Sequence, residues 1–386
     1  MYLQSIKFFT LSILLSLTSL SSLKAQSDSI IIRPIQISFV TPIGTNGKLS
    51  DQTVNNFSYN VLFGSSAGVS GLELGGLVNK TNGSIIGAQF AGLGNLGKGN
   101  LKGAQISGLI NTVAYFRGLQ AAGIINISAD TVATTDGSSV APTNGGQISG
   151  VININRSSIE GLQAAGVVNL NADSLKGAQI AGLINKSNHV QGVQISGLLN
   201  KTKTLSGVQF GIINIADTIQ KGVQVGLINI VKNGYKAIEL ESNESFYGNI
   251  NFKMGSQRLY TIFSVAYKEQ NGANIWAPGF GLGTYISLSQ KAGLNIDAIN
   301  YQVNEDEWWT SELNQLNKLK INGSYQFMNH LTLYGGVSLN VMVTKIKTSE
   351  ENPGGRLFET PNSFYDETHG STRVIIYPGI NVGIRF

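Results

Sequence analysis

The sequence predicts an all-β protein: a parallel β-solenoid of about ten 15–16-residue coils inserted in an antiparallel, outer-membrane-type β-barrel of about 8–10 strands. Three observations predict it: a sequence motif repeated ten times between Gly71 and Asn229, period-two alternation of apolar and polar residues near the C-terminus, and an N-terminal segment with the features of a secretory signal peptide. The expected parts are the signal peptide at 1–25, first barrel strands at 26–67, the solenoid at 68–232 and C-terminal barrel strands at 233–386.

The repeat motif is Gly-x-Gln-x-x-Gly-apolar-apolar-Asn, as in residues 103–111 and 192–200. Its central residue recurs every 15 or 16 residues, apart from one step of 27 that contains the polar segment from Ala129 to Pro142. That segment predicts a loop inserted in a regular array. The ten central residues are Glu73, Gln89, Gln105, Gln120, Gln147, Gln163, Gln179, Gln194, Gln209 and Gln224.

A unit of this length suits one coil of a parallel solenoid that rises ~4.8 Å to the next coil. Stacking places like residues over like, so Gln89 and Gln105 would belong to one amide ladder and Asn95 and Asn111 to another. Such ladders satisfy amides whose burial without a partner would cost about 1–3 kcal/mol each. The recurrence of amides at these two positions therefore favours a solenoid.

The apolar residues around each amide are expected to fill the narrow interior, as for Val193 and Ile195, with Leu198 or Leu199 further on. The glycine three residues after the amide, such as Gly108, predicts a bend or a close approach of two backbones, where a Cβ would clash.

An alternative makes each repeat one transmembrane strand of a barrel with some twenty strands. Bacterial barrels alternate tight turns at one end with longer loops at the other. The repeat spacing shows no such alternation, and antiparallel neighbours would not place Gln regularly over Gln. The solenoid is the preferred interpretation.

Long alternating segments occupy the C-terminal part. Leu333, Val337 and Leu339 fall on one face of a strand, and Tyr334 and Asn340 fall on the other. Strands of about ten residues with apolar residues outside and polar residues inside are typical of a transmembrane barrel. The alternative is a soluble sandwich, which turns its apolar face inward.

The last residues also favour the barrel. Ile380, Val382, Ile384 and Phe386 lie opposite Arg385 and its polar or small neighbours, which resembles the closing strand of bacterial outer-membrane barrels. Residues 35–40 and 57–63 read as two more strands that we expect to join the same sheet.

Export is predicted from Lys7, the apolar run 8–23 and a small residue at Ala25, after which cleavage is expected. The chain has no cysteine, so disulfides, thiolate metal sites and a cysteine lipid anchor are excluded. Loss of Lys7 and Lys24 lowers the formal charge from +5 to +3, too weak a balance to indicate nucleic acid.

The copy of the motif at 192–200 resembles the Gly-Val-Gln-x-x-Gly-Leu-x-Asn arrays of a group of largely uncharacterised bacterial surface-repeat proteins. The resemblance covers Gly71 to Asn229. It implies exposure at the cell surface and no known activity, and it transfers no functional residue.

Candidate chemistry is sparse. The histidines lack acidic partners at metal-ligand spacing, and the turn acids fall at non-equivalent places in the repeat, so solvated surface residues are expected. These residues are His189, His330, His369, Glu160, Asp173 and Asp217.

The most concentrated polar and aromatic cluster is Glu305-Asp306-Glu307 beside Trp308-Trp309. It suits a cation or carbohydrate contact, but a charged loop with indoles at a membrane interface is preferred.

The sequence therefore favours a non-enzymatic protein anchored in a bacterial outer membrane, a structural, adhesive or partner-binding scaffold. Its expected partners are outer-membrane lipid and a surface protein or glycan. No cofactor, metal, catalytic residue or nucleic acid is predicted. The alternatives are a transport channel whose repeats form barrel strands or a lumen plug, and a β-helix glycan-active enzyme, which needs a carboxylate pair that this sequence does not offer.

Overall fold

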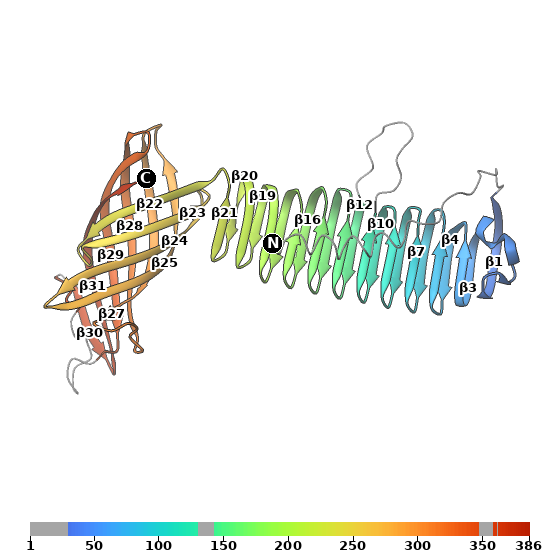
Figure 1. Cartoon of the computed structure of the whole chain (residues 1–386), viewed down its shortest axis with the longest axis horizontal. Helices are drawn as coiled ribbons and strands as arrows, with labels where there is room; N and C mark the ends of the chain where they lie inside the picture. Colours follow the sequence, from blue (N-terminus) through green and yellow to red (C-terminus); the bar gives the residue numbers. More distant parts are fainter. Residues whose placement is uncertain (1–29, 130–142, 347–357, 361) are drawn as a thin grey trace, which may run out of the picture.

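A capped array of stacked coils leads into a closed antiparallel sheet (Figure 1). The computed structural model describes residues 30–129, 143–346, 358–360 and 362–386. The expected signal peptide and nearly all of the segment from Ala129 to Pro142 lie outside these residues. Within them, the one helical element is the 3-10 helix η1, Gly47–Gln52.

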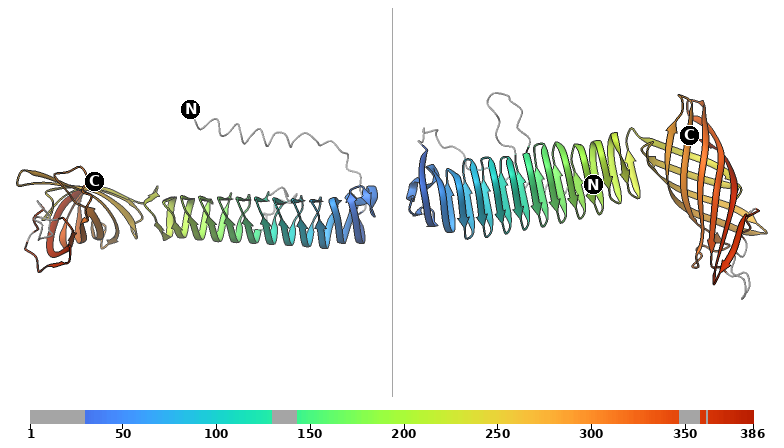
Figure 2. Two further views of the ribbon diagram at one scale, coloured as in Figure 1. Left: turned by 90° about the horizontal axis from the view of Figure 1, so that it is seen from below. Right: turned by 180° about the vertical axis from the view of Figure 1, so that it is seen from behind.

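The array is a parallel β-solenoid of about ten turns (Figure 2). Each coil has a longer strand that carries the central amide and a short strand that carries the Asn. The longer strands are β4 (Gly68–Gly75), β6 (Ile85–Ala91), β8 (Leu101–Ser107), β10 (Phe116–Ala122), β12 (Thr143–Ser149), β14 (Ile159–Ala165), β16 (Ser174–Ala181) and β18 (His189–Ser196). The short strands are β5 (Val78–Thr81), β7 (Gly94–Gly97), β9 (Ile110–Val113), β11 (Ile125–Ser128), β13 (Ile152–Asn155), β15 (Val168–Asn171), β17 (Ile184–Lys186) and β21 (Ile228–Val231), while β19 (Leu199–Phe210) and β20 (Ile213–Val225) each run through both positions.

The register of the array places like residues side by side. Gln105 pairs with Gln89 on one side and Gln120 on the other, all in parallel strands. The 27-residue step keeps this register, because Gln120 pairs directly with Gln147. Parallel pairing throughout the array contradicts the alternative in which each repeat is one strand of a large antiparallel barrel.

Two amide ladders run through the interior, as predicted. Gln105 Nε2 donates to Gln89 Oε1 at 2.7 Å, so the Gln ladder donates toward the N-terminal coils. Asn95 Nδ2 donates to Asn111 Oδ1 at 2.9 Å, so the Asn ladder donates toward the C-terminal coils. Because every internal amide has a neighbour above and below, fully buried polar side chains are stable at both positions.

Two columns of glycine allow the coils to stack this closely. A Cβ on Gly123 would lie 2.1 Å from the carbonyl oxygen of Gly108, which confirms the close approach predicted for that position. The sequence did not predict a structural role for the first glycine of each repeat motif. Gly177, in this column, has φ of +134°, and its Cβ would lie 2.1 Å from the carbonyl oxygen of Gly161.

The prediction that the apolar neighbours of the amides fill the interior is wrong. Ile195 is 39% exposed and Leu198 is 41% exposed, whereas Gln194 in the same coil is fully buried. The interior apolar column lies instead at the start of each longer strand, as for Ile159 and Leu175. Since the amides satisfy one another, the centre of the coil need not be apolar, and much apolar surface faces outward.

Residues 31–66 cap the array and do not join the closed sheet, contrary to expectation. Strands β1 (Ile31–Val40) and β3 (Thr53–Ser66) pair with each other in parallel, and β3 pairs in parallel with β4 and β5. The small strand β2 (Ile43–Gly44) turns back onto β1. Alternation alone does not distinguish the two sheets, and here the inward residues Gln36 and Ser58 continue the Gln column. The array thus precedes the closed sheet and is not inserted in it.

The C-terminal sheet is antiparallel and closes on itself, because its first strand pairs with its last. Its strands are β22 (Tyr235–Asn243), β23 (Gly248–Gly255), β24 (Tyr260–Gln270), β25 (Ala273–Ser287), β26 (Ala292–Gln302), β28 (Asn314–Met328), β29 (Leu331–Thr344) and β31 (Thr372–Arg385), with β27 (Asn304–Glu305) and β30 (Tyr365–His369) at one end.

The two faces of this sheet differ in polarity. Val337 and Val382 are 59% and 64% exposed, whereas Asn340, Asn381 and Arg385 are buried inside. Outward positions are therefore largely apolar, and the interior holds buried polar and charged residues, as the alternation predicted. One closed sheet with this interior contradicts the sandwich, in which two sheets enclose an apolar core.

We predict that Gly177→Ala destabilises the array, because its Cβ meets a carbonyl oxygen and its φ is unfavourable to any residue with a side chain, a strain of about 1–3 kcal/mol before the clash is counted. Gly146→Ala is the matched control, since its φ is ordinary and its nearest neighbour lies 3.4 Å away. Hydrogen exchange of the neighbouring coils would measure both. Equal protection in the two variants would contradict the stacking constraint.

Candidate functional site

The interior of the closed sheet holds a network of buried ionised side chains. Inward positions on β22 carry Glu239 and Glu241, two residues apart, and those on β28 carry Lys318 and Lys320. A strand places alternate side chains on one face, so each pair points into the same space. The network is completed by Lys253, Asp297, Arg385 and Glu244.

Each cation in this network contacts a carboxylate. Lys253 Nζ lies 2.9 Å from Glu239 Oε1 and 2.7 Å from Asp297 Oδ2. Lys320 Nζ lies 2.8 Å from Glu241 Oε2, and Arg385 Nε lies 2.7 Å from Glu239 Oε1. Four cations thus face four carboxylates. Balanced pairing is what buried charge requires, because an unpaired buried ion is strongly destabilising.

Apolar side chains fill the rest of the interior toward the end that carries β27 and β30. Phe246 packs against Tyr301 and Phe358, with ring centroids 5.9 and 5.5 Å apart. Leu316 and Tyr377 belong to the same buried cluster. Paired ions and aromatic rings therefore occupy much of the interior of the closed sheet among the described residues.

Sequence reasoning missed this network, although a signal for it exists. The charged residues of β28, Lys318 and Lys320, and the acidic residues of β22, Glu239 and Glu241, all fall at inward positions, whereas Lys236 at the start of β22 is exposed. Charge confined to one face of an apolar strand indicates an enclosed polar space. The pairing itself could not be read, since the partners Lys320 and Glu241 are far apart in the chain.

The acidic and aromatic cluster at 305–309 is divided in the structure. Glu305 is buried and accepts a hydrogen bond from Asn314 Nδ2 at 2.9 Å. Trp308 is 85% exposed, and its ring lies 5.3 Å from that of Trp276. The cluster therefore combines an inward carboxylate that holds a loop with an exposed indole, Trp308, that lies beside the half-buried Trp276, and its side chains do not converge on one ligand.

The other candidate side chains are dispersed on the surface. Glu160 pairs with Lys176 at 3.0 Å, and Asp173 accepts a hydrogen bond from Ser158 at 2.7 Å. His369 Nε2 lies 3.4 Å from Glu367, whereas His189 and His330 are exposed elsewhere. Among the described residues, no group of three or more His, Cys, Asp or Glu side chains could hold a metal ion.

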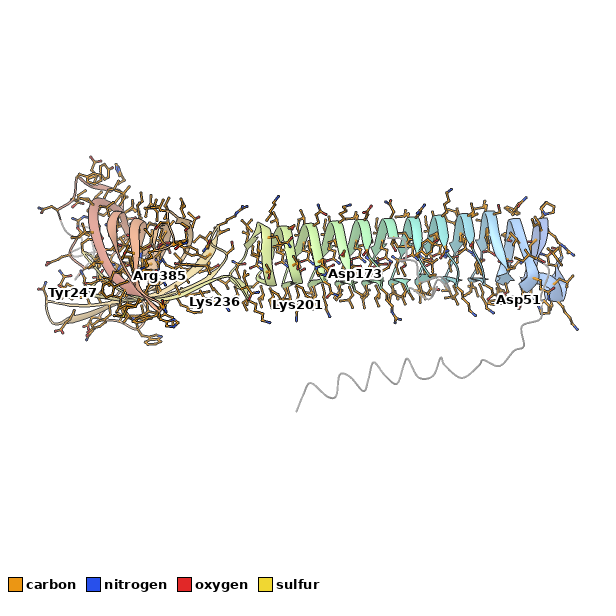
Figure 3. All side chains as sticks on the ribbon, turned by 90° about the horizontal axis from the view of Figure 1, so that it is seen from above. Asp51, Asp173, Lys201, Lys236, Tyr247 and Arg385 are labelled. Carbon is orange, nitrogen blue, oxygen red and sulfur yellow. The ribbon has the colours of Figure 1, made fainter. Side chains whose placement is uncertain are left out.

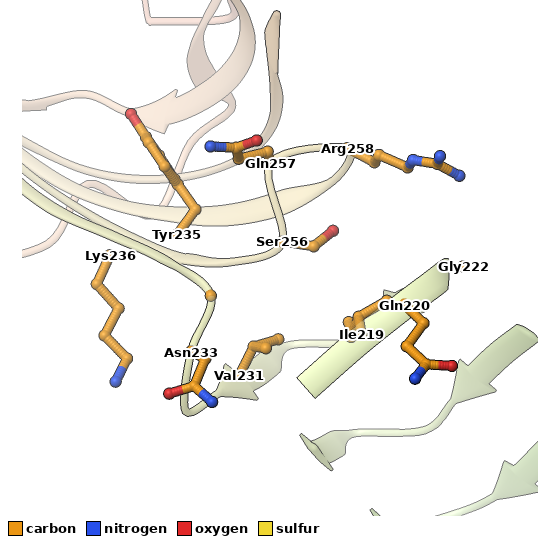
Figure 4. Close-up of a pocket in the computed structure, with 11 residues that line it drawn as sticks. Ile219, Gln220, Gly222, Val231, Asn233, Tyr235, Lys236, Ser256, Gln257 and Arg258 are labelled. Atoms are coloured by element: carbon orange, nitrogen blue, oxygen red, sulfur yellow. The ribbon is translucent and has the colours of Figure 1, made fainter. Parts of the chain in front are cut away.

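A cavity of about 430 Å³ opens where the last coil meets the closed sheet (Figure 4). It is lined by Gln220, Asn233, Tyr235, Lys236 and Arg258, among others. Lys236 and Arg258 point away from each other in Figure 4. The cavity is therefore a gap beside the junction, whose charged groups do not face a common ligand.

The amide ladders end differently at their two ends. At the free end, marked by Asp51 in Figure 3, Glu73 replaces the central Gln and accepts hydrogen bonds from Asn60 Nδ2 at 3.1 Å and Gln89 Nε2 at 2.5 Å. The two oxygens of a carboxyl group can accept from both directions, where an amide would present a donor to one of them. At the other end, Asn229 Nδ2 donates to Thr261 Oγ1 of the closed sheet at 2.8 Å. The ladder thus continues across the junction.

Comparison with known proteins found no matching family model, no similar curated protein and no similar solved structure. A search for membrane-spanning helices found none of sufficient length and hydropathy in the described parts of the chain.

We predict that the N-terminal coils lose stability as pH rises. Burial raises the pKa of Glu73 from 4.5 to about 7. Between these values the unfolded chain releases the proton first, so stability is highest below pH 4.5 and declines by about 3 kcal/mol as pH passes 7. Hydrogen exchange of β4 and β6, corrected for intrinsic rates, would show the decline, and Glu73→Gln would abolish it. The coils at 159–200 are the internal control, and an equal decline there would contradict the assignment to Glu73.

We predict that Lys320→Met destabilises the closed sheet by about 3–5 kcal/mol, because it leaves Glu241 buried without its cation. The double variant Lys320→Met with Glu241→Gln should recover most of this loss. Arg373→Met is the control, since its pair with Asp366 is partly exposed and contributes about 1 kcal/mol or less. Urea unfolding of the full chain, followed by tryptophan fluorescence, would rank the three variants. A double variant as unstable as the single one would exclude charge pairing as the cause.

Proposed function

We propose that this protein is a non-enzymatic outer-membrane protein whose closed sheet spans the bilayer and whose array serves as a rigid scaffold for a partner protein or glycan. The observation that carries the proposal is the polarity of the closed sheet, with apolar side chains outside and paired charges inside. Eight main antiparallel strands, an even number, fit the architecture of bacterial outer-membrane barrels. The signal-peptide pattern at 1–25 supports export.

An anchoring role is favoured over transport because of what fills the sheet. The paired ions and the aromatic cluster around Phe246 occupy the space that a channel would need. The array does not fill this space either, since it extends away from the sheet in Figures 1 and 2. We therefore propose a plugged anchor.

Connection lengths support a periplasmic position for the array. At the end of the sheet where the array joins, the connections are short, namely 256–259, 288–291 and 329–330. The two longest connections, from β26 to β28 and from β29 to β31, leave and rejoin the sheet at the opposite end. Outer-membrane barrels have short periplasmic turns and longer extracellular loops. This arrangement favours a periplasmic scaffold over the cell-surface position suggested by the resemblance of the repeats.

Cysteine labelling in cells would test this topology, since the natural chain offers no cysteine background. Trp308→Cys lies in a long connection and Lys203→Cys lies in the array. We expect a membrane-impermeant maleimide to label Trp308→Cys in intact cells and Lys203→Cys only after the outer membrane is permeabilised. Labelling of Lys203→Cys in intact cells would place the array at the cell surface and contradict the periplasmic position.

A further inference from the structure

One long edge of the array is apolar in every coil. This apolar edge comprises the residue directly after the central amide and the two apolar residues that follow the next glycine. All thirty positions in the ten copies are Leu, Ile, Val, Phe, Ala or Gly. Leu183 and Ile212, at the turn itself, are 48% and 49% exposed. At ~4.8 Å per coil the edge is roughly 45 Å long, far larger than scattered surface residues would make.

The backbone along the apolar edge is hydrogen-bonded within the array. The N–H groups of Leu109 and Ile110 both donate to the carbonyl oxygen of Leu93 in the preceding coil, at 2.9 and 3.0 Å. Asn111 Nδ2 reaches outward to the carbonyl oxygen of Ala121 at 2.7 Å. A surface in contact with hydrocarbon must satisfy its backbone groups internally, and these turns do so.

The opposite edge of the array is polar. Its turns carry exposed Lys98, Arg156, Asp173, Lys203 and Asp217. The array is therefore amphipathic about its long axis, with charges along one edge and none of them along the other. An amphipathic helix with this division of polarity lies at a membrane interface with its apolar side toward the acyl chains, and the array has the same division.

The connection to the closed sheet sets the direction in which the apolar edge faces. Strand β21 runs from the apolar edge to the polar edge, and only residues 232–234 separate it from β22. In Figure 1 this connection leaves from the upper edge of the array, which is therefore the polar edge. The apolar edge is the lower one, and it faces the same way as the end of the closed sheet that carries β27 and β30. The bond from Asn229 to Thr261 also ties the last coil to the sheet.

We propose that the apolar edge rests in the acyl-chain region of the membrane leaflet beside the array end of the closed sheet. This inference depends on the proposed function, because the sheet must span that same membrane. Lipid is favoured over a second copy of the chain, since protein interfaces average about one hydrogen bond per 100–200 Å² and the thirty edge positions offer no polar side chain. The short connection also keeps the array next to lipid at all times.

Single cysteines in the full chain, labelled with the environment-sensitive fluorophore NBD, would test the contact in vesicles of phosphatidylethanolamine and phosphatidylglycerol. Leu198→Cys reports on the apolar edge, and Lys203→Cys on the polar edge of the same coil. Leu319→Cys, outward on β28 and 44% exposed, reports on insertion of the sheet. We expect brominated lipids to quench Leu198→Cys and Leu319→Cys at least twofold more than Lys203→Cys.

The outcomes separate the two proposals. Quenching at Leu319→Cys with Leu198→Cys no more quenched than Lys203→Cys would overturn the lipid contact and leave the membrane anchor standing. Absence of quenching at Leu319→Cys would overturn the anchor itself. A blue-shifted but unquenched Leu198→Cys whose emission reddens on dilution with lipid would assign the edge to a second copy and reject the lipid contact.

Discussion

The coil-to-coil amide ladder is the interaction on which the array depends. A Gln or Asn side chain has both donor and acceptor groups, so a stack of identical residues satisfies itself without water or a partner of another type. Each ladder therefore fixes the register between neighbouring coils at one position of the repeat. It also requires neighbouring backbones to approach so closely that two positions per coil admit only glycine, as at Gly123 and Gly177.

The same ladder explains the unusual distribution of apolar residues. A polar centre that is satisfied internally frees Leu, Ile and Val from the interior, and the outer surface of each coil carries them, as Leu198 shows. The closed sheet has the same inversion, with ion pairs inside and apolar residues outside. Both parts of the chain thus bury polar interactions within and expose large apolar residues on part of their outer surface.

Much of the fold could be predicted from the sequence because its rules are local or periodic. The repeat length and the recurrence of Gln and Asn predicted the parallel coils, and the alternation of apolar and polar residues predicted the polarity of the C-terminal strands. The side chains of Ile195 and Leu198 were misplaced because apolar residues normally seek the interior, and here the ladder overrides that preference. Residues 31–66 were misplaced because alternation indicates a strand and not its neighbour. The ion network in the closed sheet required contacts between distant strands, such as Lys320 with Glu241, that no periodicity reveals.

The opposite polarity of the two ladders has a consequence for how the array can change over generations. Each coil passes one donor forward and one backward, so an internal coil finds a matching coil on either side. Only the contacts at the ends differ, where Glu73 replaces Gln and Asn229 donates to Thr261 of the closed sheet. Unequal recombination between copies can therefore add or delete a whole coil without disturbing either terminus. The length of the array can then change during evolution in steps of ~4.8 Å, one coil at a time.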